Sequence, residues 1–141
     1  MNQIDAILKQ FKTWYSFMDL RHLWYCCDGE IEDNEDYPDV IFEYDPETAF
    51  FMALERLLKS GNECLTYNLN SEDSLRDGER LTCSPDEQLA LLKEVWIGKE
   101  KMDQLDEENG YLGWYFLNII PYSVIHKKYN ENGNFLKWFL N

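Results

Sequence analysis

The segment from residue 28 to residue 47, DGEIEDNEDYPDVIFEYDPE, constrains the fold more than any other part of this sequence. Half of its residues are acidic, and it contains no lysine or arginine. A buried core could not hold these charges, because unpaired ions are strongly disfavoured in apolar surroundings. A solvated tail would not need the apolar groups between them. The acids are Asp28, Glu30, Glu32, Asp33, Glu35, Asp36, Asp39, Glu43, Asp45 and Glu47, and the apolar side chains are Tyr37, Ile41, Phe42 and Tyr44.

The charge imbalance of the whole chain comes mainly from this segment. The 141 residues include 27 acids against 13 lysines and arginines, a net charge of −14. Outside residues 28–47 there are 17 acids against the same 13 bases, an excess of only four. A negative field repels nucleic acids and anionic membranes, because proteins bind both through lysine and arginine side chains. It attracts cations or a basic protein and raises the rate of association.

Length and composition favour a single domain spanning residues 1–141. The chain is 45% hydrophobic and 16% aromatic, which is enough apolar material for a core. It contains no run of 18 apolar residues, and its start, MNQIDAILKQFK, lacks the features of a secretion signal. We therefore expect a cytoplasmic protein. In that compartment four reduced and mostly buried thiols are expected, at Cys26, Cys27, Cys64 and Cys83.

Periodicity and capping residues predict four helices. Apolar residues at steps of three and four predict one helix over residues 2–15 and a second that ends at Gly29. Asp45 is a suitable N-cap for a third helix, since proline follows it at the first helical position. Ser84 begins a capping box with a glutamate three residues later, and this fourth helix is predicted to end at Gly98.

The strand pattern is concentrated near the middle and the end of the chain. Alternating apolar residues predict a strand over 63–69, and two alternating runs around Asn132-Gly133 predict a C-terminal hairpin. Residues 114–120 are apolar throughout, so a short helix and a strand are both compatible with them. Residues 70–80 and 99–110 are polar and are predicted to be loops. The expected fold is α+β, mainly helical, with a small antiparallel sheet.

Nothing in the sequence indicates an enzyme. Hydrolase, zinc-protease, Walker and dinucleotide-binding patterns do not occur. His22 and His126 are expected in a helix and a strand, with no nucleophile–base pair beside them. We therefore expect no catalytic residues and no cofactor.

The acidic segment also departs from the calcium-binding loop of EF-hand proteins. Its first twelve residues, DGEIEDNEDYPD, place glycine second rather than sixth, where the loop must turn sharply. We assign no metal ligands. A weak divalent-cation site of another form and a plain solvated acidic loop stay open as alternatives.

Acids interspersed with aromatic residues suit a protein interface that has an apolar centre and a charged rim. The side chains would neutralise a basic partner, and a nuclease is the best-motivated partner because its groove is cationic. Such an inhibitor would occupy the groove in place of RNA or DNA. The predicted contact residues are Glu30, Glu32, Asp33, Glu35, Asp36 and Asp39 for charge, and Tyr37, Phe42 and Tyr44 for the apolar centre.

The block SPDEQLALLKEVW at residues 84–96, supported by ALERLLKSG at 53–61, resembles the bacterial domain-of-unknown-function family 596. Members of that family are found beside contact-dependent-inhibition and other polymorphic toxins. The resemblance implies a non-enzymatic immunity protein that neutralises a cognate toxin. It brings no catalytic motif and does not locate the binding surface. A cytosolic acidic adaptor or regulatory protein for another basic partner is the alternative.

Overall fold

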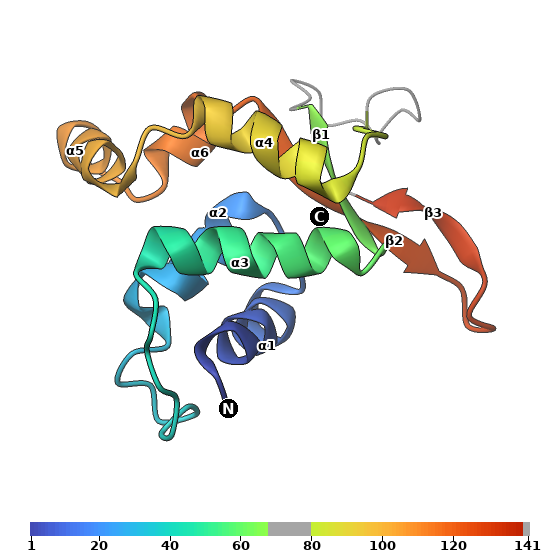
Figure 1. Ribbon diagram of the computed structural model, residues 1–141, viewed down its shortest axis with the longest axis horizontal. Coiled ribbons are helices and arrows are strands. Elements are labelled where there is room, and N and C mark those ends of the chain that lie inside the picture. Colours follow the sequence, from blue (N-terminus) through green and yellow to red (C-terminus); the bar gives the residue numbers. More distant parts are fainter. Residues whose placement is uncertain (68–79, 140–141) are drawn as a thin grey trace.

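The computed structural model describes residues 1–67 and 80–139. Within them the chain forms an α+β domain of six α-helices, one π-helical turn and three antiparallel strands (Figure 1). The expected fold class is confirmed. In order, the elements are α1 (Gln3–Tyr15), α2 (Leu20–Tyr25), the π-turn η1 (Cys26–Glu30), α3 (Pro46–Lys59), β1 (Glu63–Tyr67), α4 (Pro85–Val95), α5 (Lys99–Asn109), α6 (Trp114–Asn118), β2 (Tyr122–Tyr129) and β3 (Phe135–Phe139).

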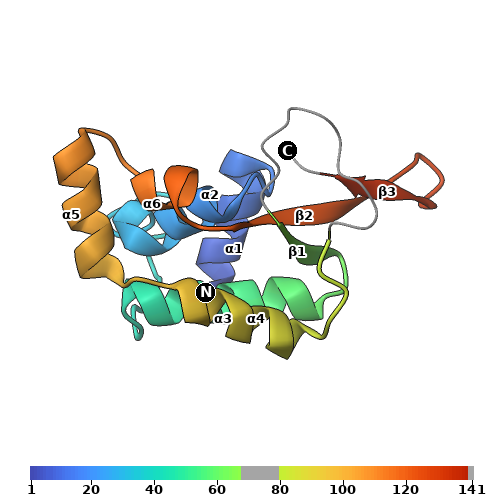
Figure 2. The same cartoon turned by 90° about the horizontal axis from the view of Figure 1, so that it is seen from above.

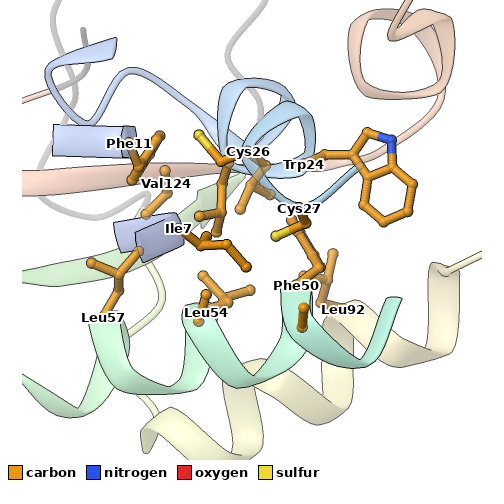
Figure 3. Close-up of a cluster of buried hydrophobic side chains, with 14 of the residues drawn as sticks. Ile7, Phe11, Trp24, Cys26, Cys27, Phe50, Leu54, Leu57, Leu92 and Val124 are labelled. Atoms are coloured by element: carbon orange, nitrogen blue, oxygen red, sulfur yellow. The ribbon is translucent and has the colours of Figure 1, made fainter. Parts of the chain in front are cut away.

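Helix α3 lies at the centre of the packing and contacts α1, α4, η1 and β1. Its apolar stripe is fully inside the protein, as the spacing of Phe50, Leu54 and Leu57 predicts for an amphipathic helix. Figure 3 shows Leu54 and Leu57 of α3 facing Ile7 and Phe11 of α1, with Val124 of β2 behind them.

A second part of the core is aromatic and lies between α2, α3 and the chain that leaves α4. The ring of Trp96 stacks on Phe50 with their centroids 5.0 Å apart, and it contacts Trp24 at 5.6 Å. Tyr115 of α6 meets the same indole at 5.8 Å. Because Trp96 turns into this cluster, α4 ends at Val95, three residues before the predicted stop at Gly98.

The three strands form an antiparallel sheet in the order β1-β2-β3. Leu65 of β1 pairs with Val124 of β2, and both are buried under the helices. Strand β3 pairs with β2 alone among the described strands, so it lies at one edge. The predicted hairpin is confirmed, and in Figures 1 and 2 its turn projects beyond the helical body.

The helix starts expected from capping residues are confirmed. Asp45 accepts the backbone N–H of Thr48 at 2.7 Å, and Ser84 accepts that of Glu87 at 3.2 Å. The cysteines are also as expected: all four are free thiols, three are buried and Cys83 is partly buried. The predicted strand 63–69 is confirmed as far as Tyr67, whereas its last two residues and nearly all of the loop expected at 70–80 lie outside the described residues.

The loop predicted over 99–110 is wrong, because Lys99–Asn109 form helix α5. Only Met102 of this helix is buried, which explains why no apolar stripe appears in its sequence. Residues 114–120, compatible with a helix or a strand, begin with the short helix α6. In the last strand, Phe135 and Leu136 are each about half exposed.

Candidate functional site

The acidic segment leaves the helical body through the π-turn η1. Gly29 has a φ of +95°, a conformation that a side chain would strain, and the chain changes direction there. Ile31 then returns to the core and is fully buried. The rest of the segment runs past α1 and reaches α3, as the loop between α2 and α3 shows in Figure 1.

Two glutamines of α1 fix this segment from inside. Gln10 is buried; its Nε2 donates to Glu30 Oε1 at 2.8 Å, and its Oε1 accepts from the hydroxyl of Tyr37 at 3.0 Å. The hydroxyl of Tyr15 also donates to the Glu30 carboxylate, at 2.6 and 2.7 Å. Burial and this carboxylate both raise the pKa of Tyr15. Glu30 is therefore part of a hydrogen-bonded support.

Gln3, two helical turns earlier on the same face, holds the far end of the segment. Its Oε1 accepts the backbone N–H groups of Glu43 and Tyr44, each at 2.9 Å. Its Nε2 donates to the carbonyl of Tyr44, also at 2.9 Å. A β-bridge between Asn2 and Ile41 lies beside these bonds. The amide of Gln3 thus substitutes for a neighbouring strand and orders the extended run from Ile41 to Tyr44.

Four of the ten carboxylates stabilise the fold. Glu30 does so through Gln10 and Tyr15, as described. Asp28 forms an ion pair with Lys99 at 3.4 Å. Asp45 caps α3, and the hydrogen bond from Thr48 N–H lowers the pKa of its carboxyl. Glu47 accepts the first backbone N–H of α5, at Lys99.

The other six carboxylates form no hydrogen bond or ion pair with any residue in the described part of the chain. All six belong to exposed residues, so their charges face solvent within one short segment. We call this set the acidic face. It consists of Glu32, Asp33, Glu35, Asp36, Asp39 and Glu43.

The apolar side chains of the segment also fall into two groups, one buried and one exposed. Tyr37 is only 7% exposed and belongs to the core, so it cannot form the apolar centre of an interface as predicted. Its hydroxyl draws it inward because Gln10 offers a buried acceptor. Phe42 and Tyr44 are 41% and 39% exposed, and Ile41 is 68% exposed. Sequence reasoning did not place Ile41 at the surface of the site.

An exposed tryptophan lies on α1, the helix whose glutamines hold the acidic segment. Trp14 is 68% exposed and follows Gln10 by one helical turn on the same face of α1. Its spacing matches that of the apolar residues in the first helix, and periodicity does not distinguish the last turn of such a stripe from its middle. Tryptophan is enriched among residues that dominate binding energy in interfaces.

Two surface hollows share Gln3 and Tyr44 in their walls. The first has a volume of 480 Å³, and its apolar lining includes Ile4, Ile41 and Met52. The second has a volume of 400 Å³ and is lined by Phe42 together with buried residues of α1 and η1. Exposed apolar groups with recesses between them and acids around them match the anatomy of a protein-binding surface.

The contacts and burial of the two histidines and of Cys26 and Cys27 belong to the packing of the fold. His22 Nδ1 lies 2.8 Å from Asp19 Oδ1 at the start of α2, and burial lowers the pKa of His126. Burial also raises the pKa of Cys26 and Cys27 well above the usual thiol range.

Among residues 1–67 and 80–139, no three histidine, cysteine or acidic side chains converge on a position that could hold a metal ion. None of the described helices has the length and apolar character needed to span a membrane.

Comparison with known proteins shows the fold alone. No protein-family model matches this sequence, and no curated protein sequence matches it. A solved structure, an uncharacterised protein conserved in bacteria from Neisseria meningitidis, is similar to the chain with a TM-score of 0.57. The match covers 96% of this chain and 86% of that one at 18% sequence identity. The α+β arrangement therefore also occurs in a bacterial protein of similar extent.

Proposed function

We propose that this chain is a non-enzymatic immunity protein that acts in the cytoplasm. It binds a cognate bacterial toxin, a basic nuclease domain, through the acidic face and the apolar residues beside it. The contact residues are Glu32, Asp33, Glu35, Asp36, Asp39 and Glu43 for charge, and Ile41, Phe42 and Tyr44 for the apolar centre.

The observation that supports this proposal is that the carboxylates of residues 28–47 fall into two groups. Carboxylates needed for folding have partners, whereas the acidic face has none among the described residues. Repulsion among neighbouring like charges disfavours the compact state, and a partner's cations would remove it on binding. A protein that keeps six such charges around three exposed apolar side chains is suited to capture a basic surface.

In this proposal the protein inhibits the toxin by covering the groove that binds its nucleic-acid substrate. Lysines and arginines that a nuclease uses to hold phosphates would pair with the acidic face. Apolar groups of the toxin would enter the two hollows beside Tyr44, one past Ile41 and the other past Phe42. Tyr37 and Glu30 would contribute indirectly, because through Gln10 they fix the position of the segment.

A toxin is favoured over another basic partner by the resemblance of residues 53–61 and 84–96 to the immunity-associated family. An adaptor for a different basic protein would use the same face and the same physics. The two functions differ in the identity of the partner and in whether binding protects cells.

Co-expression with the product of the neighbouring open reading frame, followed by co-purification, tests the role. We expect a stable complex and survival of cells that express the toxin together with this chain. Survival should be lost when Ile41, Phe42 and Tyr44 are replaced by alanine. A complex that gives no protection would support the adaptor, and the absence of any complex would contradict the toxin proposal.

A further inference from the structure

The second hollow beside Tyr44, with a volume of 400 Å³, lies where α1, η1 and the extended run of the acidic segment meet. Its buried lining is apolar: Ile7, Cys27 and Ile31 are each at most 7% exposed. Ile7 and Cys27 are drawn in Figure 3 as part of the core. Phe42 and Tyr44, 41% and 39% exposed, line the hollow toward solvent. A side chain that enters it therefore meets hydrocarbon and aromatic surface.

Two carboxylates, those of Asp28 and Glu32, also line this hollow. The side chain of Asp28 is 30% exposed, and its Oδ1 lies 3.4 Å from Lys99 Nζ. Glu32 Oε2 lies 4.0 Å from the position that a Cβ would occupy at Gly29, so this carboxylate lies beside the turn that carries Asp28. Glu32 belongs to the acidic face and has no hydrogen bond or ion pair with the described residues.

Lys99 is a cation in the lining, but a carboxylate outside the hollow neutralises it. Its Nζ lies 2.6 Å from Asp103 Oδ2, closer than to Asp28. Asp103 does not line the hollow. Because Asp103 offsets the ammonium group, the charges of Asp28 and Glu32 are left for a group that enters. A carboxylate can also accept more hydrogen bonds than the single contact that Asp28 makes with Lys99.

We propose that this hollow binds one arginine side chain of the basic partner, as an anchor of the interface. The methylene stem would lie along the buried lining, as the stems of long cationic side chains do on apolar surfaces. The guanidinium would stack on the ring of Phe42 and donate to Asp28 and Glu32. This inference rests on the proposed function only in taking the partner to be a basic protein.

The chemistry of the lining selects arginine over other groups. The two carboxylates repel an anion, and a neutral apolar group would cover them without pairing them. Lysine carries the same charge, but its ammonium is more strongly hydrated and cannot present a planar fork to two carboxylates. Arginine is also enriched among the residues that dominate binding energy in interfaces.

Methyl NMR of the full chain tests this site by titration with a capped tripeptide that has arginine between two glycines. We expect saturable shifts of the Ile7 and Ile31 methyl groups, which line the hollow. A matched lysine peptide should bind about threefold more weakly or worse. A citrulline peptide, equal in shape but uncharged, should leave these methyl groups unshifted. No shift with arginine up to about 10 mM, or equal affinities for arginine and lysine, would overturn the proposal.

Two variants separate the hollow from a general charge effect. Glu32→Gln should weaken binding of the arginine peptide about fivefold. Glu100→Gln makes the same change in charge next to Lys99 but outside the hollow, and should change the affinity by less than about twofold. Phe42→Leu keeps an apolar wall without the ring and should reduce the preference for arginine over lysine. Equal losses for the two glutamine variants, or an unchanged preference in Phe42→Leu, would contradict the proposal.

The peptide titration contains no toxin, so its outcome is separate from that of the co-purification. A stable toxin complex together with no entry of the arginine peptide would remove the anchor and leave the proposed function standing. Entry of the peptide without any toxin complex would support the anchor and contradict the toxin as the partner.

Discussion

The buried amide of Gln10 accepts a hydrogen bond from the Tyr37 hydroxyl at 3.0 Å, across 27 positions of sequence. The same amide donates to Glu30 at 2.8 Å. One polar side chain of α1 therefore fixes both a carboxylate and an aromatic ring of the acidic segment. This contact turns Tyr37 into the core and leaves the neighbouring acids in solvent.

Replacing Gln10 with leucine should destabilise the fold and loosen the acidic segment. The change leaves the Tyr37 hydroxyl without its buried acceptor and removes one donor from Glu30. A loss of about 1–3 kcal/mol in the free energy of unfolding is expected. Denaturant titration measures the loss, and hydrogen exchange should be faster over residues 30–37. Tyr37→Phe should cost less, because Glu30 keeps its partners. Equal stability of Q10L and the unmodified protein would show that this contact does not fix the segment.

Gly113 should be far less tolerant of alanine than Gly110. Both have positive φ values, +76° and +77°, so each substitution incurs a backbone cost of about 1–2 kcal/mol. A Cβ at Gly113 would also lie 2.6 Å from Arg21 Cδ and from the Tyr25 hydroxyl, whereas nothing lies within 4 Å at Gly110. We expect G113A to lose about 1–3 kcal/mol more than G110A in chemical denaturation. Similar losses for the two variants would contradict the packing of α6 against α2.

The stability of the protein should depend on pH through Glu63 of β1. Burial raises the pKa of Glu63 above the ordinary value of 4.5, although a hydrogen bond from Ser60 opposes the shift. The folded protein thus binds this proton more strongly than the unfolded chain. Its stabilising contribution is present below pH 4.5 and is lost as pH rises through the higher folded pKa. Burial of His126, opposite Glu63, lowers the pKa of that residue and acts in the reverse direction as pH falls.

The substitution Glu63→Gln isolates this effect, because glutamine keeps the shape and cannot ionise. Denaturant midpoints of E63Q and the unmodified protein should diverge as pH rises from 4.5 to neutrality, with E63Q more stable at neutral pH. A difference that stays constant over this range would show that the folded carboxyl titrates as it does in the unfolded chain.

Alanine at Ile41, Phe42 and Tyr44 should separate binding from folding. These side chains are exposed, so each substitution should change the free energy of unfolding by only about 0.5 kcal/mol. Dissociation of the toxin should be faster by tenfold or more if they form the apolar centre, since central contacts are often worth about 2 kcal/mol each. Surface plasmon resonance measures the rates, and Leu112→Ala, at a residue 70% exposed elsewhere, is the control. Equal dissociation rates would remove these residues from the interface.

The sequence predicted helices correctly where the capping residue is adjacent to the helix in the chain. Asp45 and Ser84 stand next to the helices that they cap, so α3 and α4 could be placed from the chain alone. Helix α5 could not, because Gly98 provides no capping side chain and the carboxylate that binds Lys99 N–H comes from Glu47. A cap from 52 positions away leaves no pattern in the segment that it stabilises.

The candidate site shows the same limit. Tyr37 and Tyr44 are equivalent in sequence terms, as aromatic residues among acids, yet one is in the core and the other is at the surface. The difference comes from their partners: Gln10 accepts the buried hydroxyl of Tyr37, whereas Gln3 binds only the backbone of Tyr44. In sequence alone, a glutamine in an amphipathic helix indicates a solvated face. Composition could locate the acidic segment, but only the tertiary contacts separate its structural carboxylates from the acidic face.

The most direct measurement of the central claim is the association rate with the purified toxin at several ionic strengths. The first variant replaces Glu32, Asp33, Glu35 and Asp36 with their amides. The control makes the same change in charge elsewhere, at the exposed residues Glu94, Glu100, Glu107 and Glu131.

At low salt the first variant should associate about tenfold more slowly than the unmodified protein, with a weaker dependence on salt. The control should remain close to the unmodified protein. Equal rates for the two variants would show that the acidic face is not where the toxin binds.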